Sequence, residues 1–476
     1  MPAQIKHLFV LMLENRSFDH MLGFMKADDY NIEGIDPQNL FYNEDRNERK
    51  IYVSNDARPT GDLKADPNHH FDDVTQQLYG IANPPPGQKP DMSGFVLNYA
   101  VKAGSDAAGA NIMKCFRPET LPVLCTLGRQ YAVCDHWFSS IPGPTLPNRL
   151  YVHCGTSRGR LDMAPEYYQD FYTVYEELAK HNVSSCIFWT DWSATLSFSG
   201  LMTHQNQFYV DYGLFNAICA GDEKDVPAYC FIEPRYNPAD APTGGVLPAT
   251  DQHPDNDIRD GETLTRNVYT AIRQNDDLWH SSMLVIVYDE HGGIADHVEP
   301  VPVDSPDGLS SLDPAFNFTL SGVRVPAIVV SPYIKPGTIS KVVYDHTSII
   351  ATALKLFTNT WPSDALKTRA QKAATLDSLL DLTLAPRDDW PNFAASAHTA
   401  VIPQIQAAAA KQAPLSDLQR EHVNHAISLN DTLPKGLQVR QPDGVHEQAG
   451  QAGAFVKAVG DAAIAAHQEI KQGIKQ

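Results

Sequence analysis

Residues 282–297 read SMLVIVYDEHGGIADH, an apolar run followed at once by two carboxylates. A run of Met, Leu, Val and Ile without polar alternation is typical of a strand buried on both faces, as in a parallel sheet covered by helices. Three further apolar runs end before a polar residue or a proline: HLFVLML (7–13), SCIFWT (185–190) and VPAIVVS (325–331). Together these runs predict an α/β architecture.

Helical patterns lie between and after these runs. GETLTRNVYTAIRQ begins at Gly261, and HTSIIATALKLF begins at His346, where Asp345 is a candidate N-cap. From about residue 386 the composition changes to Ala, Gln and Lys at helical spacing. We therefore expect a large domain over residues 1–385 and a small, mostly helical C-terminal region over 386–476. Ligands bind beyond the carboxyl ends of strands in open α/β sheets, so the polar residues after each run are placed where a site is expected.

The composition argues against several classes of protein. The formal net charge of −20 disfavours nucleic-acid binding and general attraction to anionic membranes. No apolar run approaches the roughly 18 residues of a transmembrane helix. Motifs of the forms GxxxxGK[ST] and HExxH are absent, as is a GxGxxG after a strand. GTSRG (155–159) has the GxSxG form but follows none of the four apolar runs, so it is not a nucleophile elbow. These observations weaken nucleotide-binding, zincin, acyl-hydrolase and hydride-transfer hypotheses. Any contact with a membrane surface is then expected to be local and transient.

The cysteines and the N-terminus bear on the compartment. Seven cysteines are odd in number and form no CxxC pair, which favours reduced thiols in the core. The N-terminal MPAQIKHLFVLML has no basic segment, cleavage site or twin arginine, and it runs straight into the first polar motif. We expect synthesis in the cytoplasm, with export by a dedicated secretion system left open.

Glu14 and Asn15 begin the first polar constellation, ENRSFDH, at the end of an apolar run. A carboxylate and an amide oxygen are hard ligands that suit a divalent cation. The same segment explains a helix start equally well, because Asn, Ser and Asp are good caps and FDHMLGFMK follows. The residue types alone leave these two interpretations even.

Asp289 and Glu290 form the second constellation. Two adjacent carboxylates after an apolar strand repel one another and are costly to bury unless a cation lies between them. A metal site is therefore favoured here over a solvated loop. The following pair, Gly292 and Gly293, permits a tight turn that can bring His297 back towards the two carboxylates.

Thr145 lies between two prolines in the third constellation, GPTLPNR. Prolines stiffen the backbone and so favour a pre-organised nucleophile, but spacing alone favours an ordinary proline-defined turn. A threonine hydroxyl becomes a useful nucleophile only when a base or a metal activates it.

Three of the eighteen histidines stand out by their neighbours: His69 in DPNHH, His253 in DQHP and His297 in DHV. A lone histidine is more often a surface residue or a satisfied core residue. Next to these acidic and polar neighbours, however, histidine side chains can donate protons to phosphoryl oxygens or to a leaving group.

Long motifs recur in one order from residue 5 to about residue 430. They are ENRSFDHMLGFMK (14–26), PNRLYVH (147–153), YDEHGG with DHV (288–298), SPDG (305–308), GVRVPAIVVSPYI (322–334), DHTSI (345–349) and PLSDLQREHVNHAISLN (414–430). In these motifs the chain closely resembles plant and bacterial non-specific phospholipases C. That family groups with bacterial phosphocholine-preferring phospholipases C and AcpA-type acid phosphatases.

The resemblance implies an alkaline-phosphatase-like α/β/α sandwich with one catalytic divalent cation, for which oxygen ligands admit Ca²⁺, Mn²⁺, Zn²⁺ or Mg²⁺. The segment after Arg158 looks divergent and shorter than in plant relatives, which leaves headgroup and acyl-chain preference open. The resemblance further implies a set of metal ligands, of which the last is also the attacking residue: Glu14, Asn15, Asp289, Glu290 and Thr145.

The reaction expected from the resemblance is hydrolysis of a glycerophospholipid such as phosphatidylcholine to diacylglycerol and a phosphorylated headgroup. Thr145 attacks to give a phosphothreonine, which water then hydrolyses. His297 or His253 protonates the departing alcohol, while Asn148 and His69 hold phosphoryl oxygens. Two alternatives remain: an acid-phosphatase-type phosphomonoesterase on the same site, and a non-catalytic lipid-binding module that has kept the fold.

Overall fold

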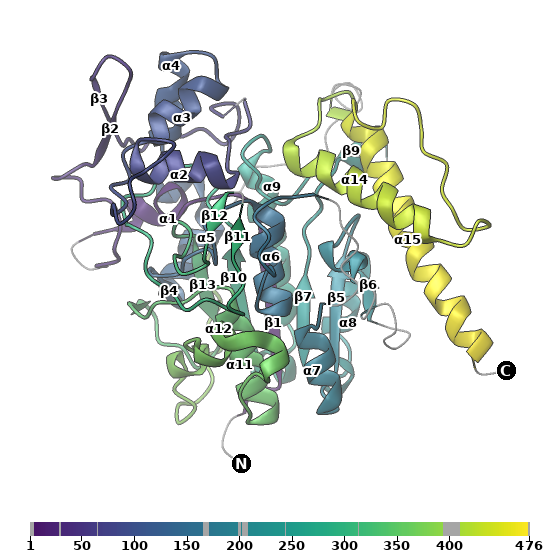
Figure 1. Ribbon diagram of the computed structural model, residues 1–476. Coiled ribbons are helices and arrows are strands. Elements are labelled where there is room, and N and C mark those ends of the chain that lie inside the picture. The colour runs from purple at the N-terminus through teal and green to yellow at the C-terminus, as the bar shows by residue number, and fades with distance from the viewer. Residues whose placement is uncertain are drawn as a thin grey trace.

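An eight-stranded sheet runs through the centre of the molecule in the order β14-β4-β13-β10-β1-β7-β5-β6 (Figure 1). The computed structural model describes residues 4–474 except 28–29, 64, 165–170, 199–200, 202–207, 243, 313 and 394–409. The strands of this sheet are β1 (His7–Leu13), β4 (Ala132–Cys134), β5 (Ser185–Trp189), β6 (Tyr209–Asp211), β7 (Tyr229–Ile232), β10 (Ser282–Tyr288), β13 (Ala327–Val330) and β14 (Thr338–Ser340).

The apolar runs form the strands that the sequence predicts. Every residue of β1, β7, β10 and β13 is buried, because helices cover both faces of the sheet. Two groups of helices do so (Figure 1). One face carries α5 (Pro122–Gln130), α8 (Phe215–Cys219), α9 (Ile258–Arg273) and α10 (Asp276–Trp279), and the other carries α6 (Thr145–Cys154), α7 (Val174–Lys180), α11 (Thr347–Thr358) and α12 (Lys367–Lys372). The predicted α/β class is confirmed.

Strand direction differs from the expected parallel arrangement at one position. β1 is parallel to both β10 and β7, whereas β13 is antiparallel to both of its neighbours, β10 and β4. For β13 to run parallel to β10, the chain would need a crossover connection, which is usually a helix. The described part of the chain between β10 and β13 contains no helix. The residues after β13, beginning with Ser331, therefore lie at the end of the sheet opposite to the residues after β10.

The two helices predicted from periodicity are present. α9 begins at Ile258, three residues before Gly261, and the Asp257 side chain caps it by accepting the N–H of Arg259. At the start of α11, Asp345 Oδ1 accepts the N–H of Thr347 at 2.9 Å. Asp345 thus supports the helix start, although His346 occupies the N-cap position.

Two further groups of elements stand above the carboxyl ends of the parallel strands (Figure 1). One group has a separate apolar cluster that includes Val74, Phe95 and Ile112. It comprises β2 (Tyr42–Glu44), β3 (Lys50–Tyr52), α2 (Phe71–Tyr79), α3 (Phe95–Lys102) and α4 (Asp106–Gly109). The other group is the C-terminal pair α14 (Asp417–Thr432) and α15 (Ala449–Ile474), which confirms the helical C-terminus.

The C-terminal pair shares the main hydrophobic core instead of forming its own. Leu418 of α14 and Phe455 of α15 belong to the same buried cluster as the central strands. Residues 387–393 also contact the main body, since Arg387 donates to the carbonyl oxygens of Gln130 and Ile334. The domain division at residue 386 stays a prediction.

The helices and the cysteines bear on membrane crossing and on the state of the thiols. No helix in the described ranges combines the length and the apolar composition that a membrane crossing requires. All seven cysteines are free and buried, as predicted for core thiols.

Candidate active site

The carboxyl ends of β1 and β10 place the two acidic segments side by side. Leu13 pairs with Tyr288 in the parallel register, so Glu14 and Asp289 follow their strands at the same height. The Asn15 N–H donates to Asp289 Oδ1 at 3.0 Å, which ties the segments together. The side chains of Glu14, Asn15, Asp289 and Glu290 are all fully buried.

Thr145 meets this group from α6. It is the first residue of that helix, with Pro144 as the N-cap and Pro147 in the first turn, where proline costs no hydrogen bond. Its hydroxyl donates to Asn15 Oδ1 at 3.1 Å and lies 3.4 Å from Glu14 Oε2. A helix N-terminus also favours negative charge, which suits a nucleophile that attacks a phosphoryl group. The structure thus brings the expected nucleophile to the expected metal ligands.

Arg149, one turn further along α6, is a site residue that the sequence analysis did not single out. Its guanidinium donates to Glu14 Oε1, to Glu233 Oε2 at 2.9 Å and to Asp289 Oδ2 at 3.2 Å. All four side chains are buried, so a single cation neutralises part of a dense negative charge. The signal available in the sequence was the i, i+4 spacing from Thr145, which places both residues on one helix face.

Burial raises the pKa of both glutamates of the predicted metal site above its usual value. Burial raises the pKa of Glu14 well above its usual value; Arg149 opposes the shift, and Asp289 adds to it. Burial also raises the pKa of Glu290 to about 8; nearby His69 opposes the shift, and Asp289 adds to it. Crowded carboxylates of this kind hold their charge at neutral pH only when a cation joins them.

The donor set fits a divalent cation. Glu290 Oε2 accepts the N–H of Gly292 at 2.7 Å, whereas Glu290 Oε1 is buried without a hydrogen-bond partner among the described residues. Asn15 adopts a left-handed conformation with φ of 55°, which asparagine tolerates better than most residues. Its amide oxygen thereby joins carboxylate and hydroxyl oxygens, the ligands that hard cations prefer.

The glycine turn after Glu290 forms as predicted, but it does not bring His297 to Asp289 and Glu290. Gly292 and Gly293 both have positive φ, and a Cβ on Gly292 would lie 2.2 Å from the carbonyl oxygen of Asn15. Only glycine allows this close approach. Beyond the turn, His297 Nδ1 contacts Asp19 Oδ2 at 2.6 Å, so His297 does not join the two carboxylates as expected.

His297 belongs to a second polar cluster with Asp19, Asp296 and Arg324. Arg324 donates to Asp19 Oδ1 at 3.1 Å and to Asp296 Oδ1 at 2.9 Å. Within the described ranges, Asp19, Asp296 and His297 are the group of carboxylate and imidazole donors whose ligand atoms all lie within 4.8 Å of one another. This cluster could hold a metal ion, although Arg324 already neutralises its two carboxylates.

His253 lies near the site between two carboxylates. Its Nδ1 contacts Asp255 Oδ1 at 2.6 Å, and its Nε2 lies 3.4 Å from Asp66 Oδ1. Burial opposes the charge, but Asp66, Asp255 and Asp251 outweigh burial and raise the pKa of His253 well above its usual value. A buried imidazolium is a ready proton donor.

His69 keeps one ring nitrogen without a hydrogen-bond partner among the described residues, whereas the side-chain amide of Asn148 is hydrogen-bonded. His69 Nδ1 donates to the carbonyl oxygen of Pro67 at 2.8 Å, and its buried Nε2 has no hydrogen-bond partner in the part of the chain that the structure describes. The Asn148 amide, in contrast, donates to the carbonyl oxygens of Gly143 and Pro144 and accepts the N–H of Ile141. Asn148 therefore fixes the loop that precedes Thr145.

α14 reaches the site from the far end of the chain. The N–H of Asp417 donates to Asp66 Oδ2 at 3.2 Å, and Gln419 Nε2 donates to the carbonyl oxygen of Tyr236 at 2.8 Å. The ring of His422 lies 4.8 Å from that of Tyr236. Tyr236 in turn donates its hydroxyl to Glu233, the partner of Arg149. α14 thus supports two parts of the site. It contacts Asp66, which pairs with His253, and Tyr236, which bonds to the Glu233 partner of Arg149.

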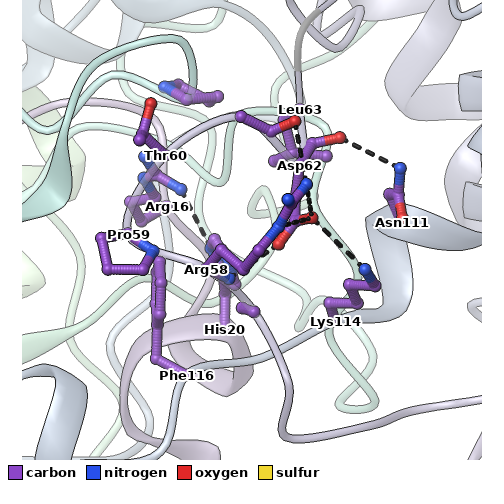
Figure 2. A pocket seen from close by; sticks show the side chains of 13 residues that line it. Arg16, His20, Arg58, Pro59, Thr60, Asp62, Leu63, Asn111, Lys114 and Phe116 are labelled. Atoms are coloured by element: carbon purple, nitrogen blue, oxygen red, sulfur yellow. Dashed lines mark hydrogen bonds and ion pairs between the residues drawn. The ribbon is translucent and has the colours of Figure 1, made fainter.

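Arg16 and His20, which follow Glu14 and Asn15 in the chain, line a small basic pocket (Figure 2). Arg16, whose N–H donates to the carbonyl oxygen of Glu290, lines it together with Arg58 and Lys114. Asp62 pairs with both Arg58 and Lys114. The volume of about 10 Å³ has room for about one water molecule and excludes a lipid headgroup.

Comparison with known proteins gives the family. The model of the phosphoesterase family matches residues 5–358. Non-specific phospholipase C6 of Arabidopsis thaliana is 37% identical over 447 residues, which cover 90% of this chain and 81% of that protein. A non-hemolytic phospholipase C of Burkholderia pseudomallei is 25% identical over 390 residues, covering 73% of this chain and 54% of that protein.

Among solved structures, the lipoteichoic acid synthase LtaP of Listeria monocytogenes is similar with a TM-score of 0.37 and 11% identity, covering 78% of this chain and 76% of that one. A TM-score this low carries no inference about function. The match over residues 5–358 includes Glu14, Thr145 and Asp289, the three segments that meet in the site. The chain therefore belongs to the phosphoesterase family.

Proposed function

We propose that the chain is a metal-dependent phospholipase C that hydrolyses glycerophospholipids such as phosphatidylcholine to diacylglycerol and a phosphorylated headgroup. The observation that carries this proposal is the contact of the Thr145 hydroxyl with Asn15 Oδ1, beside the buried Asp289, in a phosphoesterase-family chain. Relatives named as non-specific phospholipases C, of which this chain spans 73–82%, support the substrate class.

We propose Glu14, Asn15, Asp289, Glu290 and Thr145 as the ligands of one divalent cation. When bound there, a cation supplies charge that lowers the proton affinity of the Thr145 hydroxyl and stabilises the phosphoryl oxygens. Oxygen donors admit Ca²⁺, Mn²⁺, Mg²⁺ or Zn²⁺. The Asp19, Asp296 and His297 cluster is the less favoured location, because Arg324 already contacts both carboxylates.

Thr145 Oγ1 attacks phosphorus in the proposed reaction, and the bond from phosphorus to the diacylglycerol oxygen breaks. His253 gives its proton to that departing oxygen, since Asp66 and Asp255 keep the imidazole charged. The neutral His253 then accepts a proton from the water that hydrolyses the phosphothreonine. The hydroxyl proton of Thr145 passes to solvent during the attack and returns from solvent when the bond from phosphorus to Thr145 Oγ1 breaks. The net result is one diacylglycerol, one phosphorylated headgroup and a regenerated Thr145.

The other predicted residues take supporting parts. We assign the free Nε2 of His69 to contact with a phosphoryl oxygen, while Asn148 acts as a positioning residue because its amide donates to carbonyl oxygens of the loop before Thr145. His297 is set aside as the proton donor in favour of His253, since it pairs with Asp19, which Arg324 also contacts, in the other cluster.

A phosphomonoesterase of the acid-phosphatase type is the alternative that the same site permits. The test strips the protein of metal and measures diacylglycerol and phosphocholine release from phosphatidylcholine micelles after adding Ca²⁺, Mn²⁺, Zn²⁺ or Mg²⁺ in turn. Release with one metal supports the phospholipase proposal and identifies the ion. If none of the four metals gives diacylglycerol release and a simple phosphomonoester is cleaved, the phosphomonoesterase alternative is supported instead.

A further inference from the structure

We propose that the hairpin formed by β11 (Ser311–Leu312) and β12 (Ala315–Phe316) docks the protein on the surface of a zwitterionic phospholipid membrane. Leu312 is 90% exposed and nearby Leu309 is 47% exposed. Leu312 is the most exposed of the large hydrophobic side chains in the described ranges. The inference rests on the proposed function, because it names the surface on which that function meets its lipid.

Several contacts anchor the hairpin and its flanking residues to the body of the protein. The ring of Phe316 lies 5.0 Å from that of Phe71 and 4.9 Å from that of Phe318. Arg369, which is itself buried, donates to the carbonyl oxygen of Phe318 at 2.5 Å. The N–H of Thr368 also donates to the carbonyl oxygen of Pro306 at 2.8 Å. An anchored base lowers the entropic cost of presenting Leu309 and Leu312 to a lipid surface.

The base of the hairpin adjoins the segments that carry the active site. Phe318 is buried in a small cluster with Ile141 and Tyr151, and Phe71 and Phe316 pack against that cluster. Ile141 precedes Thr145 by four residues, and Phe71 follows His69 by two. Figure 1 shows the hairpin beside α6, the helix that begins at Thr145. A membrane that receives the hairpin is therefore presented to the site.

Charge and area point to a zwitterionic membrane as the partner. Residues 305–320 contain no Lys or Arg, and the formal charge of −20 on the whole chain disfavours anionic lipid. Two cations do lie nearby, since Arg158 and Arg160 flank Gly159, where an added Cβ would lie 3.9 Å from Leu309 Cβ. Stable protein interfaces bury on the order of 1,000 Å² or more, which two leucine side chains do not supply. Insertion of a few apolar side chains suits a reversible contact with lipid.

The test compares the double variant Leu309→Asn/Leu312→Asn with a control variant, Leu384→Asn. Leu384 is 40% exposed in a turn bonded to Tyr333, whose hydroxyl donates to the carbonyl oxygen of His280 before β10. It therefore lies at the end of the sheet opposite the site. Three quantities are measured: co-sedimentation with phosphatidylcholine vesicles, hydrolysis of vesicle lipid, and hydrolysis of monomeric short-chain phosphatidylcholine.

We expect the double variant to lose about a hundredfold in vesicle partitioning, because each of the two leucines contributes about a factor of ten. Vesicle hydrolysis should fall in parallel, while turnover of the monomeric lipid and both properties of the control stay as in the wild type. Unchanged partitioning of the double variant overturns the inference. So does tighter binding of the wild type to anionic vesicles than to zwitterionic ones.

Failure of the proposed function gives a different result. A wild-type protein that hydrolyses neither lipid form would end the phospholipase proposal, while vesicle co-sedimentation would still test the hairpin. If the double variant folds poorly, the variant Leu312→Trp replaces it. Its fluorescence should shift to the blue when phosphatidylcholine vesicles are added, and an unchanged spectrum in the same titration contradicts the inference.

Discussion

Leu13 and Tyr288 occupy paired positions at the ends of two parallel strands, and this pairing assembles the site. Because the strands run the same way and end at the same height, the residues that follow them meet without any long loop. Glu14 and Asp289 thereby share one guanidinium, that of Arg149. The negative charge that this cation leaves uncompensated is the physical reason to expect a metal.

Metal affinity distinguishes the two candidate clusters. Glu290→Gln removes a proposed ligand without changing side-chain volume, and it should weaken Mn²⁺ binding by at least about tenfold in a calorimetric titration. The matched variant His297→Gln removes a donor of the other cluster and should leave the affinity unchanged. The reverse pattern would place the ion between Asp19 and Asp296.

The pH dependence of turnover tests His253 as the proton donor. Asp255→Asn removes a negative neighbour 2.6 Å from His253 Nδ1 and so lowers the pKa of the imidazole. The charged form is the active one, so the alkaline limb of the kcat profile should move to lower pH. Asp257→Asn serves as the control, because Asp257 caps α9 and pairs with Arg259, and asparagine caps equally well. An alkaline limb at the same pH in both variants contradicts this assignment.

Two tyrosines give a matched test of the support behind Arg149. The Tyr236 hydroxyl donates to Glu233 at 2.5 Å, whereas the Tyr229 hydroxyl is buried without a hydrogen-bond partner among the described residues. Tyr236→Phe should lower the free energy of unfolding by about 2 kcal/mol and reduce kcat, since a hydrogen bond to a charged group is lost. Tyr229→Phe should be neutral or slightly stabilising. Denaturant titration and kcat measurement check both, and equal effects would argue against the support proposed here.

Glu262 makes part of the stability depend on pH. Burial raises its pKa to about 7, although the N–H groups of Val123 and Leu124, at the start of α5, oppose the shift. The folded chain keeps this proton between about pH 4.5 and 7, where the unfolded chain has lost it, so the free energy of unfolding falls as pH rises through that range.

Glu262→Gln should therefore remove up to about 3 kcal/mol of the fall in unfolding free energy between pH 4.5 and 7. Denaturant titrations across this range measure the difference from the wild type. Glu44→Gln, on the exposed hairpin of β2 and β3, should change nothing. A wild-type slope that survives in Glu262→Gln would show that other groups cause it.

The fold and the acidic core of the site follow from local sequence patterns. Uninterrupted apolar runs identify β1 and β10, and the residues after them meet in the site: Asn15 accepts from the Thr145 hydroxyl and donates its N–H to Asp289. The reversed direction of β13 was not predictable in this way, because apolar runs carry no information about strand direction. It follows instead from the connection after β10, whose described residues include no helix.

The missed residues are those defined by contacts across long sequence separations. Arg149 reaches Glu233 over 84 residues and Glu14 over 135, and no local pattern encodes such a meeting. His297 shows the opposite difficulty, since the glycine turn was foreseen but the partner at its far end, Asp19, was not. The docking of α14 against Asp66 likewise depends on packing of the whole chain.

The most direct test of the account is the turnover of Thr145→Ala on phosphatidylcholine with saturating metal. Replacing the nucleophile should reduce kcat by at least about a thousandfold while the fold is kept, and Thr145→Ser should retain measurable turnover and a phosphorylated residue after acid quenching. Near-normal turnover of Thr145→Ala under these conditions would contradict the account.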